Sequence, residues 1–168
     1  MNSFKAIQER QYKEAQKSEE LFCKITGAVK GTQQDDYNHI DARIGDVTYD
    51  VKGIKGCHSK GYILVELRNV QGKSGWCSPH GADKIAFQFQ GEFVIVDNNE
   101  LYRYVQKKMI PKINNKKGVL RGSSLHKKYG FSNISYTLMG RNNRKDIFVY
   151  IPKEDLMELK EKTYTYEV

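Results

Sequence analysis

The stretch 39–69 decides the fold, and it reads HIDARI at 39–44, VTYDVK at 47–52 and YILVELRN at 62–69. Apolar and polar residues alternate in each run, which predicts three short strands. Gly45 and Asp46 join the first two runs and suit a two-residue hairpin turn. We therefore predict a hairpin in which Ile44 pairs with Val47, followed by the third strand.

This register places two acidic residues opposite each other. Asp41 faces Asp50 on the polar side of the hairpin, and Lys52 lies on the same side. Alternation in the third strand lets Glu66 join them. Opposed carboxylates repel each other, and a divalent cation beside a lysine would offset that repulsion. A solvated sheet face whose charges happen to oppose one another explains the pattern equally well.

The order and spacing of several short motifs resemble the PD-(D/E)XK nuclease superfamily, and more narrowly its small phage-encoded members. The resemblance spans most of residues 37–97 and 144–158. Its motifs are HID at 39–41, YDVKG at 49–53, VELRNVQG at 65–72, GW at 75–76, ADKIAF at 82–87 and RKDIFVYIP at 144–152. It implies a restriction-endonuclease-like core: an α/β fold, bordering on α+β, with a central mixed β-sheet flanked by helices.

The resemblance also implies roles for the polar residues of the hairpin. Asp50 and Glu66, together with Asp41, would act in catalysis and hold one or two Mg²⁺ ions, for which Mn²⁺ would substitute. These ions would polarise the scissile phosphate and activate a water molecule. Lys52 would orient that water or stabilise developing charge.

A helix is predicted over residues 3–24, and its acidic residues are further candidates. In PD-(D/E)XK folds such a helix often adds a carboxylate to the metal site. Glu20 is the candidate ligand here, with Glu19 as the alternative. Glutamates on a helix surface are more commonly only solvated.

One residue departs from the motif. If Glu66 opens the (D/E)XK tripeptide, the third residue is Arg68, which cannot readily lose a proton and so could not act as a base. Lys52 is the better candidate for that role. An alternative alignment combines Asp41 with the tripeptide at 50–52.

Basic residues concentrate in one segment of the chain. The net charge is +8, and residues 101–145 contain twelve Lys and Arg but no Asp or Glu. Such a segment suits the phosphate backbone of DNA, contacted without reading sequence, although an anionic protein partner would suit it too. The candidate DNA-binding residues are Lys107, Lys108, Lys112, Lys116, Lys117, Arg121, Lys127 and Lys128.

The three cysteines of the chain form no disulfide framework, which is typical of a reducing cytoplasm. Cys57, His58, Cys77 and His80 could hold zinc if their loops met. Because the first two are adjacent, unlike the usual ligand spacing, we do not expect zinc there.

Length and hydropathy set the organisation that we expect. A chain of 168 residues predicts a single domain over 1–168, with a basic, mobile insertion at about 111–133. Helices are predicted from Asn99 to Pro111 and over 153–162. No apolar run approaches the roughly 18 residues of a membrane span, so we expect a cytoplasmic protein that binds no membrane.

The sequence therefore predicts a metal-dependent endodeoxyribonuclease, encoded by a phage and acting on DNA in the host cytoplasm. The alternative is a non-catalytic nucleic-acid-binding or host-interaction protein on a degenerate nuclease fold, which Arg68 favours. A host or phage protein, or a second copy in a homodimer, could be a further partner.

Overall fold

Strand pairing divides the chain between two sheets. The computed structural model describes residues 2–113 and 118–168. The chain folds into two compact units. The first contains Met1–Ile54, Ala82–Ile95 and Glu161–Val168, and the second contains Lys55–Gly81 and Val96–Lys160. Helices and both parallel and antiparallel strand pairs are present, so the predicted class, a mixed α/β fold bordering on α+β, is confirmed.

The first unit contains a six-stranded sheet in the order β1-β2-β3-β5-β6-β10. The predicted hairpin register is confirmed, because Ile44 pairs with Val47 between antiparallel β2 and β3. On its other side β3 pairs in parallel with β5. The elements are α1 (Asn2–Thr26), β1 (Val29–Lys30), α2 (Gln33–Tyr37), β2 (Ala42–Ile44), β3 (Val47–Lys52), β5 (Lys84–Phe89), β6 (Glu92–Asp97) and β10 (Lys160–Thr165).

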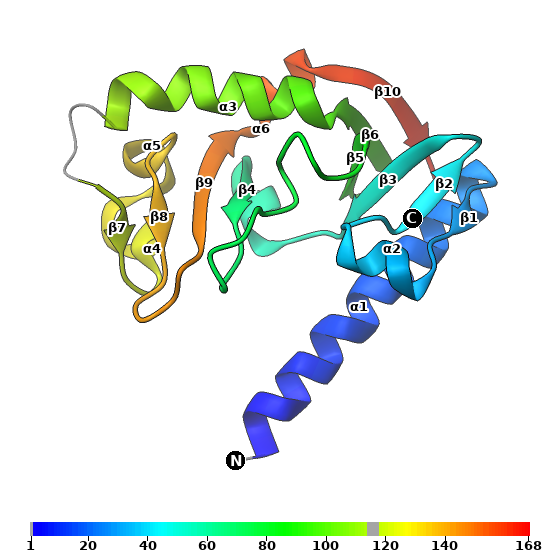
Figure 1. The fold of residues 1–168 in the computed structure, drawn as a ribbon, viewed down its shortest axis with the longest axis horizontal. Helices are drawn as coiled ribbons and strands as arrows, with labels where there is room; N and C mark the ends of the chain where they lie inside the picture. The colour runs from blue at the N-terminus through cyan, green and yellow to red at the C-terminus, as the bar shows by residue number, and fades with distance from the viewer. Residues whose placement is uncertain (1, 114–117) are drawn as a thin grey trace. The chain divides into compact units, whose positions relative to one another are not determined.

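The core of the first unit is aromatic. Phe22, near the C-terminal end of α1, is fully buried, and its ring centroid lies 5.3 Å from those of Tyr49 on β3 and Phe93 on β6. The C-terminal end of α1 (blue in Figure 1) packs against β1, β2 and β3. Burial of this large ring fixes the helix on the sheet.

The second unit contains a four-stranded sheet in the order β4-β9-β8-β7. Leu125, Ile134 and Met139 form a buried cluster, against which Phe148 and Tyr150 pack. The elements are η1 (Gly56–Lys60), β4 (Tyr62–Arg68), α3 (Asn98–Ile113), β7 (Leu120–Arg121), α4 (Leu125–Tyr129), α5 (Phe131–Ile134), β8 (Met139–Gly140), β9 (Ile147–Pro152) and α6 (Lys153–Glu158).

Several predicted elements differ from those observed. The third strand, β4, pairs with β9 of the second sheet and not with the hairpin. Helix α3 continues past Pro111 to Ile113, and the last predicted helix ends at Glu158, after which β10 follows. The described part of the expected insertion, from residue 118 onward, contains β7, α4 and α5. Residues 114–117 lie outside the described residues.

Among the described residues, no helix has both the length and the apolar character needed to cross a bilayer.

Candidate functional site

The β2–β3 hairpin brings Asp41 and Asp50 together, as the register predicted. Tyr49 and Val51 pack into the core beside Phe22, so Asp50, between them, points to the opposite face of the sheet. Asp50 is only 1% exposed. Asp41 directly precedes β2, and its Oδ2 accepts a hydrogen bond of 2.7 Å from the backbone N–H of Val51. The side chain of Asp41 therefore satisfies a backbone donor of β3 at a point where β2 no longer pairs with it.

Lys52 supplies positive charge to this carboxyl pair. Its Nζ lies 2.7 Å from Oδ1 of Asp50. A carboxylate as deeply buried as that of Asp50 is costly to ionise unless a cation lies next to it. Lys52 on the same strand meets this requirement, as the sequence pattern indicated.

The pKa of Asp41 is raised toward neutral pH by its surroundings. Burial of Asp41, the charge of neighbouring Asp50 and a hydrogen bond between the two side chains raise the pKa of Asp41 to about 7. The backbone N–H of Val51 and the charge of Lys52 act in the opposite direction but do not cancel this rise. Close carboxyl pairs commonly behave in this way, because both cannot ionise freely at short range.

Helix α1 adds a third carboxyl group, that of Glu19. Burial, followed by the charge of Asp41, raises the pKa of Glu19 to about 7. Gly53 lets the helix come this close to the end of β3, because a Cβ at this position would lie 2.7 Å from Oγ of Ser18. Glu20, which the resemblance favoured, is exposed on the helix, so Glu19 is the helix residue beside the pair.

This site has more carboxyl groups than cations. Lys52 and Lys30 partly offset the charges of Glu19, Asp41 and Asp50. Within 2–113 and 118–168, no three His, Cys, Asp or Glu side chains are arranged to hold a metal ion, the Cys57/His58/Cys77/His80 set included. Mg²⁺ commonly needs only one or two carboxylates and keeps several waters, so the buried pair fits this ion.

Glu66 belongs to a different sheet. It pairs with Phe148 of β9, and its backbone carbonyl accepts a hydrogen bond from the N–H of Cys77. Glu66 therefore does not lie on the sheet that contains the hairpin, contrary to the expectation that it shares the polar face of the hairpin. The free side of β3 pairs with β5, and β4 pairs with β9 instead. A role for Glu66 beside Asp50 is supported only by the motif resemblance.

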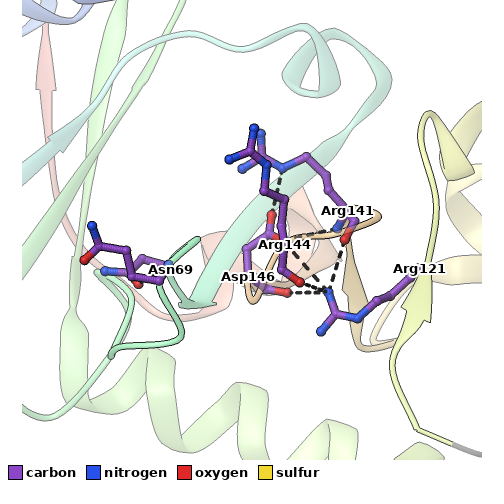
Figure 2. A network of polar contacts seen from close by, with 6 residues as sticks. Asn69, Arg121, Arg141, Arg144 and Asp146 are labelled. Atoms are coloured by element: carbon purple, nitrogen blue, oxygen red, sulfur yellow. Dashed lines mark hydrogen bonds and ion pairs between the residues drawn. The ribbon is translucent and has the colours of Figure 1, made fainter.

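The basic candidates of the second unit divide into two kinds. The exposed lysines Lys107, Lys108, Lys127 and Lys128 are accessible to a polyanion. Arg121 instead stabilises the fold, because its Nη1 donates hydrogen bonds to the carbonyls of Arg141, Arg144 and Asp146, as Figure 2 shows. Arg121 is exposed as well, so its contribution to DNA binding stays a prediction. Lys116 and Lys117 lie outside the described residues, as does the side chain of Lys112.

No family model, curated protein or solved structure matches this chain.

Proposed function

We propose that this protein is a metal-dependent nuclease that hydrolyses phosphodiester bonds of DNA. The observation that carries the proposal is the buried carboxyl pair, Asp41 and Asp50, with the ammonium group of Lys52 at 2.7 Å from Asp50. Buried, mutually repelling carboxylates destabilise a fold, and they are most readily explained by a cation that they bind.

Each residue has a defined task in this proposal. Asp41 and Asp50 would hold Mg²⁺, which when bound supplies Lewis acidity toward the phosphate and lowers the pKa of a water molecule. The ammonium group of Lys52 lies beside Asp50 and would stabilise negative charge on the phosphate as it develops. Glu19, with a pKa of about 7, can accept or release a proton close to neutral pH.

The site supports one of the two motif alignments more than the other. Asp41 followed by Asp50-Val51-Lys52 reproduces the order of PD-(D/E)XK, with a lysine at the third position of the tripeptide. The alignment that starts the tripeptide at Glu66 has Arg68 at that position. We therefore assign the lysine role to Lys52.

The second candidate is a nucleic-acid-binding protein that does not cleave. The observation that favours it is the lack of any three-residue metal-ligating group within the described residues. In that case the carboxyl pair and Lys52 would be structural, while the exposed lysines of the second unit would still attract nucleic acid.

A cleavage assay separates the two candidates. We expect supercoiled plasmid to be nicked or linearised with Mg²⁺ or Mn²⁺ and to stay intact with EDTA. Asp50→Asn should abolish cleavage, and Lys52→Ala should lower the rate by about 10²-fold or more. Asp46→Asn is the matched control, because Asp46 is an exposed aspartate in the turn of the same hairpin. It should cleave like the parent.

Two results would contradict the proposal. One is a parent protein that cleaves neither duplex nor single-stranded DNA with either metal. The other is an Asp50→Asn variant as active as the Asp46→Asn control. If Glu66→Gln is inactive while Lys52→Ala is fully active, the alignment through Arg68 is the correct one.

A further inference from the structure

The second unit contains a pocket that takes no part in the proposed hydrolysis. Its volume is about 710 Å³, within the range of roughly 300–1,000 Å³ that is usual for small-molecule sites. The walls come from the end of β4, the loop that follows it, α3 and the start of β9. All of these segments belong to the second unit.

Hydrogen bonds hold the walls of the pocket in place. The loop after β4 is closed by Oδ1 of Asn69, which accepts from the backbone N–H groups of Gln71 and Lys73, both at 3.0 Å. The following loop is held by Nδ2 of Asn98, at the start of α3, which donates to the carbonyl of Trp76 at 3.1 Å. A cavity whose walls are fixed in advance loses little entropy when a ligand binds.

The polar lining favours an anion. Arg68, Ser74 and His80 line the pocket, and none of its described lining residues is acidic. The two segments that supply most of the lining, 67–82 and 101–145, contain no Asp or Glu. Asp146 lies next to the lining, but its Oδ2 is 2.8 Å from Nε of Arg141, so its charge is already compensated. Arginine with hydroxyl and imidazole groups is the typical donor set for a phosphate.

The rest of the lining favours a flat, partly apolar group. Tyr102 and Gln106 are one helical turn apart on α3 and line the pocket, whereas their neighbours Leu101 and Val105 are fully buried. Leu138 and Ile147 add apolar surface. A tyrosine ring beside an amide can stack on a nucleobase and hydrogen-bond its edge.

We propose that this pocket binds a nucleoside phosphate, either as a free nucleotide or as one unit of a nucleic-acid strand. Arg68 contacts the phosphate, with Ser74 and His80 as further donors. Tyr102 stacks on the base, and Gln106 contacts its edge. The carboxyl pair takes no part, so the pocket can bind even if the protein is not a nuclease.

Calorimetry in EDTA tests this inference without any cleavage. The ligands are thymidine 5′-monophosphate, a short oligothymidylate, thymidine and inorganic phosphate. We expect the two nucleotide ligands to bind, and thymidine and phosphate each to bind at least tenfold more weakly, because each lacks half of the contacts. Tighter binding of the oligonucleotide assigns the pocket to a strand, whereas equal affinities assign it to a free nucleotide.

Matched variants identify the pocket as the site. Arg68→Ala should weaken nucleotide binding about tenfold or more, whereas Arg103→Ala, which removes an exposed arginine of α3 outside the lining, should not. Tyr102→Ala should weaken binding by a similar factor, and Tyr102→Phe, which keeps the ring, should bind like the parent. The inference is overturned if neither nucleotide ligand binds the parent. It is also overturned if phosphate binds as tightly as the nucleotide, or if the two arginine variants behave alike.

Discussion

At the scale of single residues, the raised pKa of Asp41 beside Asp50 is the feature with the widest consequences. The ordinary pKa of an aspartate is 3.8, and that of Asp41 is raised to about 7. Between these two values the folded protein binds more protons than the unfolded chain. The contribution of Asp41 to stability therefore falls as the pH rises from about 4 to 7, because the folded state resists losing this proton.

Replacing Asp41 by a residue that cannot ionise should abolish this pH-dependent loss of stability. Asp41→Asn keeps an oxygen that can accept from the N–H of Val51 but carries no charge. Relative to the parent, we expect the variant to gain about 1–3 kcal/mol in free energy of unfolding between pH 5 and pH 8. Urea unfolding at the two pH values measures this difference. Asp46→Asn should show no such gain, and parallel pH profiles for Asp41→Asn and the parent would show that the pKa of Asp41 is not raised in the folded protein.

Glu19 shows what sequence reasoning could and could not find at this scale. A carboxylate from the first helix was expected, but the pattern favoured its exposed neighbour Glu20. The signal that separates them is helical phase: Glu19 is three residues before Phe22, the buried residue that anchors α1 to the sheet. The choice needs the identity of the anchoring residue, and the apolar stripe of this helix is too irregular to give it.

At the scale of elements, local pairings were predictable and distant ones were not. The hairpin register followed from alternation and a two-residue turn, both of which are local in sequence. The neighbour of β3 on its other side is β5, a parallel strand more than 30 residues away, and nothing in the run at 62–69 indicates that β4 pairs with β9 instead. Alternation predicts the faces of a strand but not its partner.

The strand β10 was missed for a related reason. Residues 153–162 are rich in glutamate, lysine and leucine, which favour a helix, and α6 does form over the first six of them. The chain then changes to a strand at Lys160, where Tyr164 and Tyr166 pack against the aromatic core of the first unit. Tertiary packing here outweighs local helix propensity.

At the scale of the whole molecule, charge is divided between the two units. The carboxyl pair belongs to the first unit, and the acid-free segment 101–145 belongs to the second. The separation of the acidic residues from the basic segment could be predicted from the sequence, because it depends only on composition. The pocket could not be predicted in this way, since its lining comes from segments separated by up to 80 residues.

The exposed lysines of the second unit should set the salt dependence of DNA binding. Replacing Lys107, Lys108, Lys127 and Lys128 by glutamine should weaken binding. On duplex DNA, the slope of log K against log salt should fall by about 0.9 for each phosphate that the protein no longer neutralises. Fluorescence anisotropy at several salt concentrations, in EDTA, measures the slope. Replacing the exposed Lys5, Lys13, Lys17 and Lys24 of α1 removes the same charge and is the control. Equal slopes in the two variants would mean that net charge, and not this surface, attracts DNA.

Metal binding to the carboxyl pair tests the central proposal most directly. Isothermal titration calorimetry of the DNA-free protein with Mn²⁺ at pH 6.5, in two buffers of different ionisation enthalpy, reports both affinity and proton release. Because Asp41 and Glu19 have pKa values of about 7, a bound cation must displace protons. We expect binding with proton release in the parent and in Asp46→Asn, and neither in Asp50→Asn. A parent that binds no Mn²⁺, or an Asp50→Asn variant that binds it with the same affinity and proton release, would contradict the assignment of a metal to this hairpin.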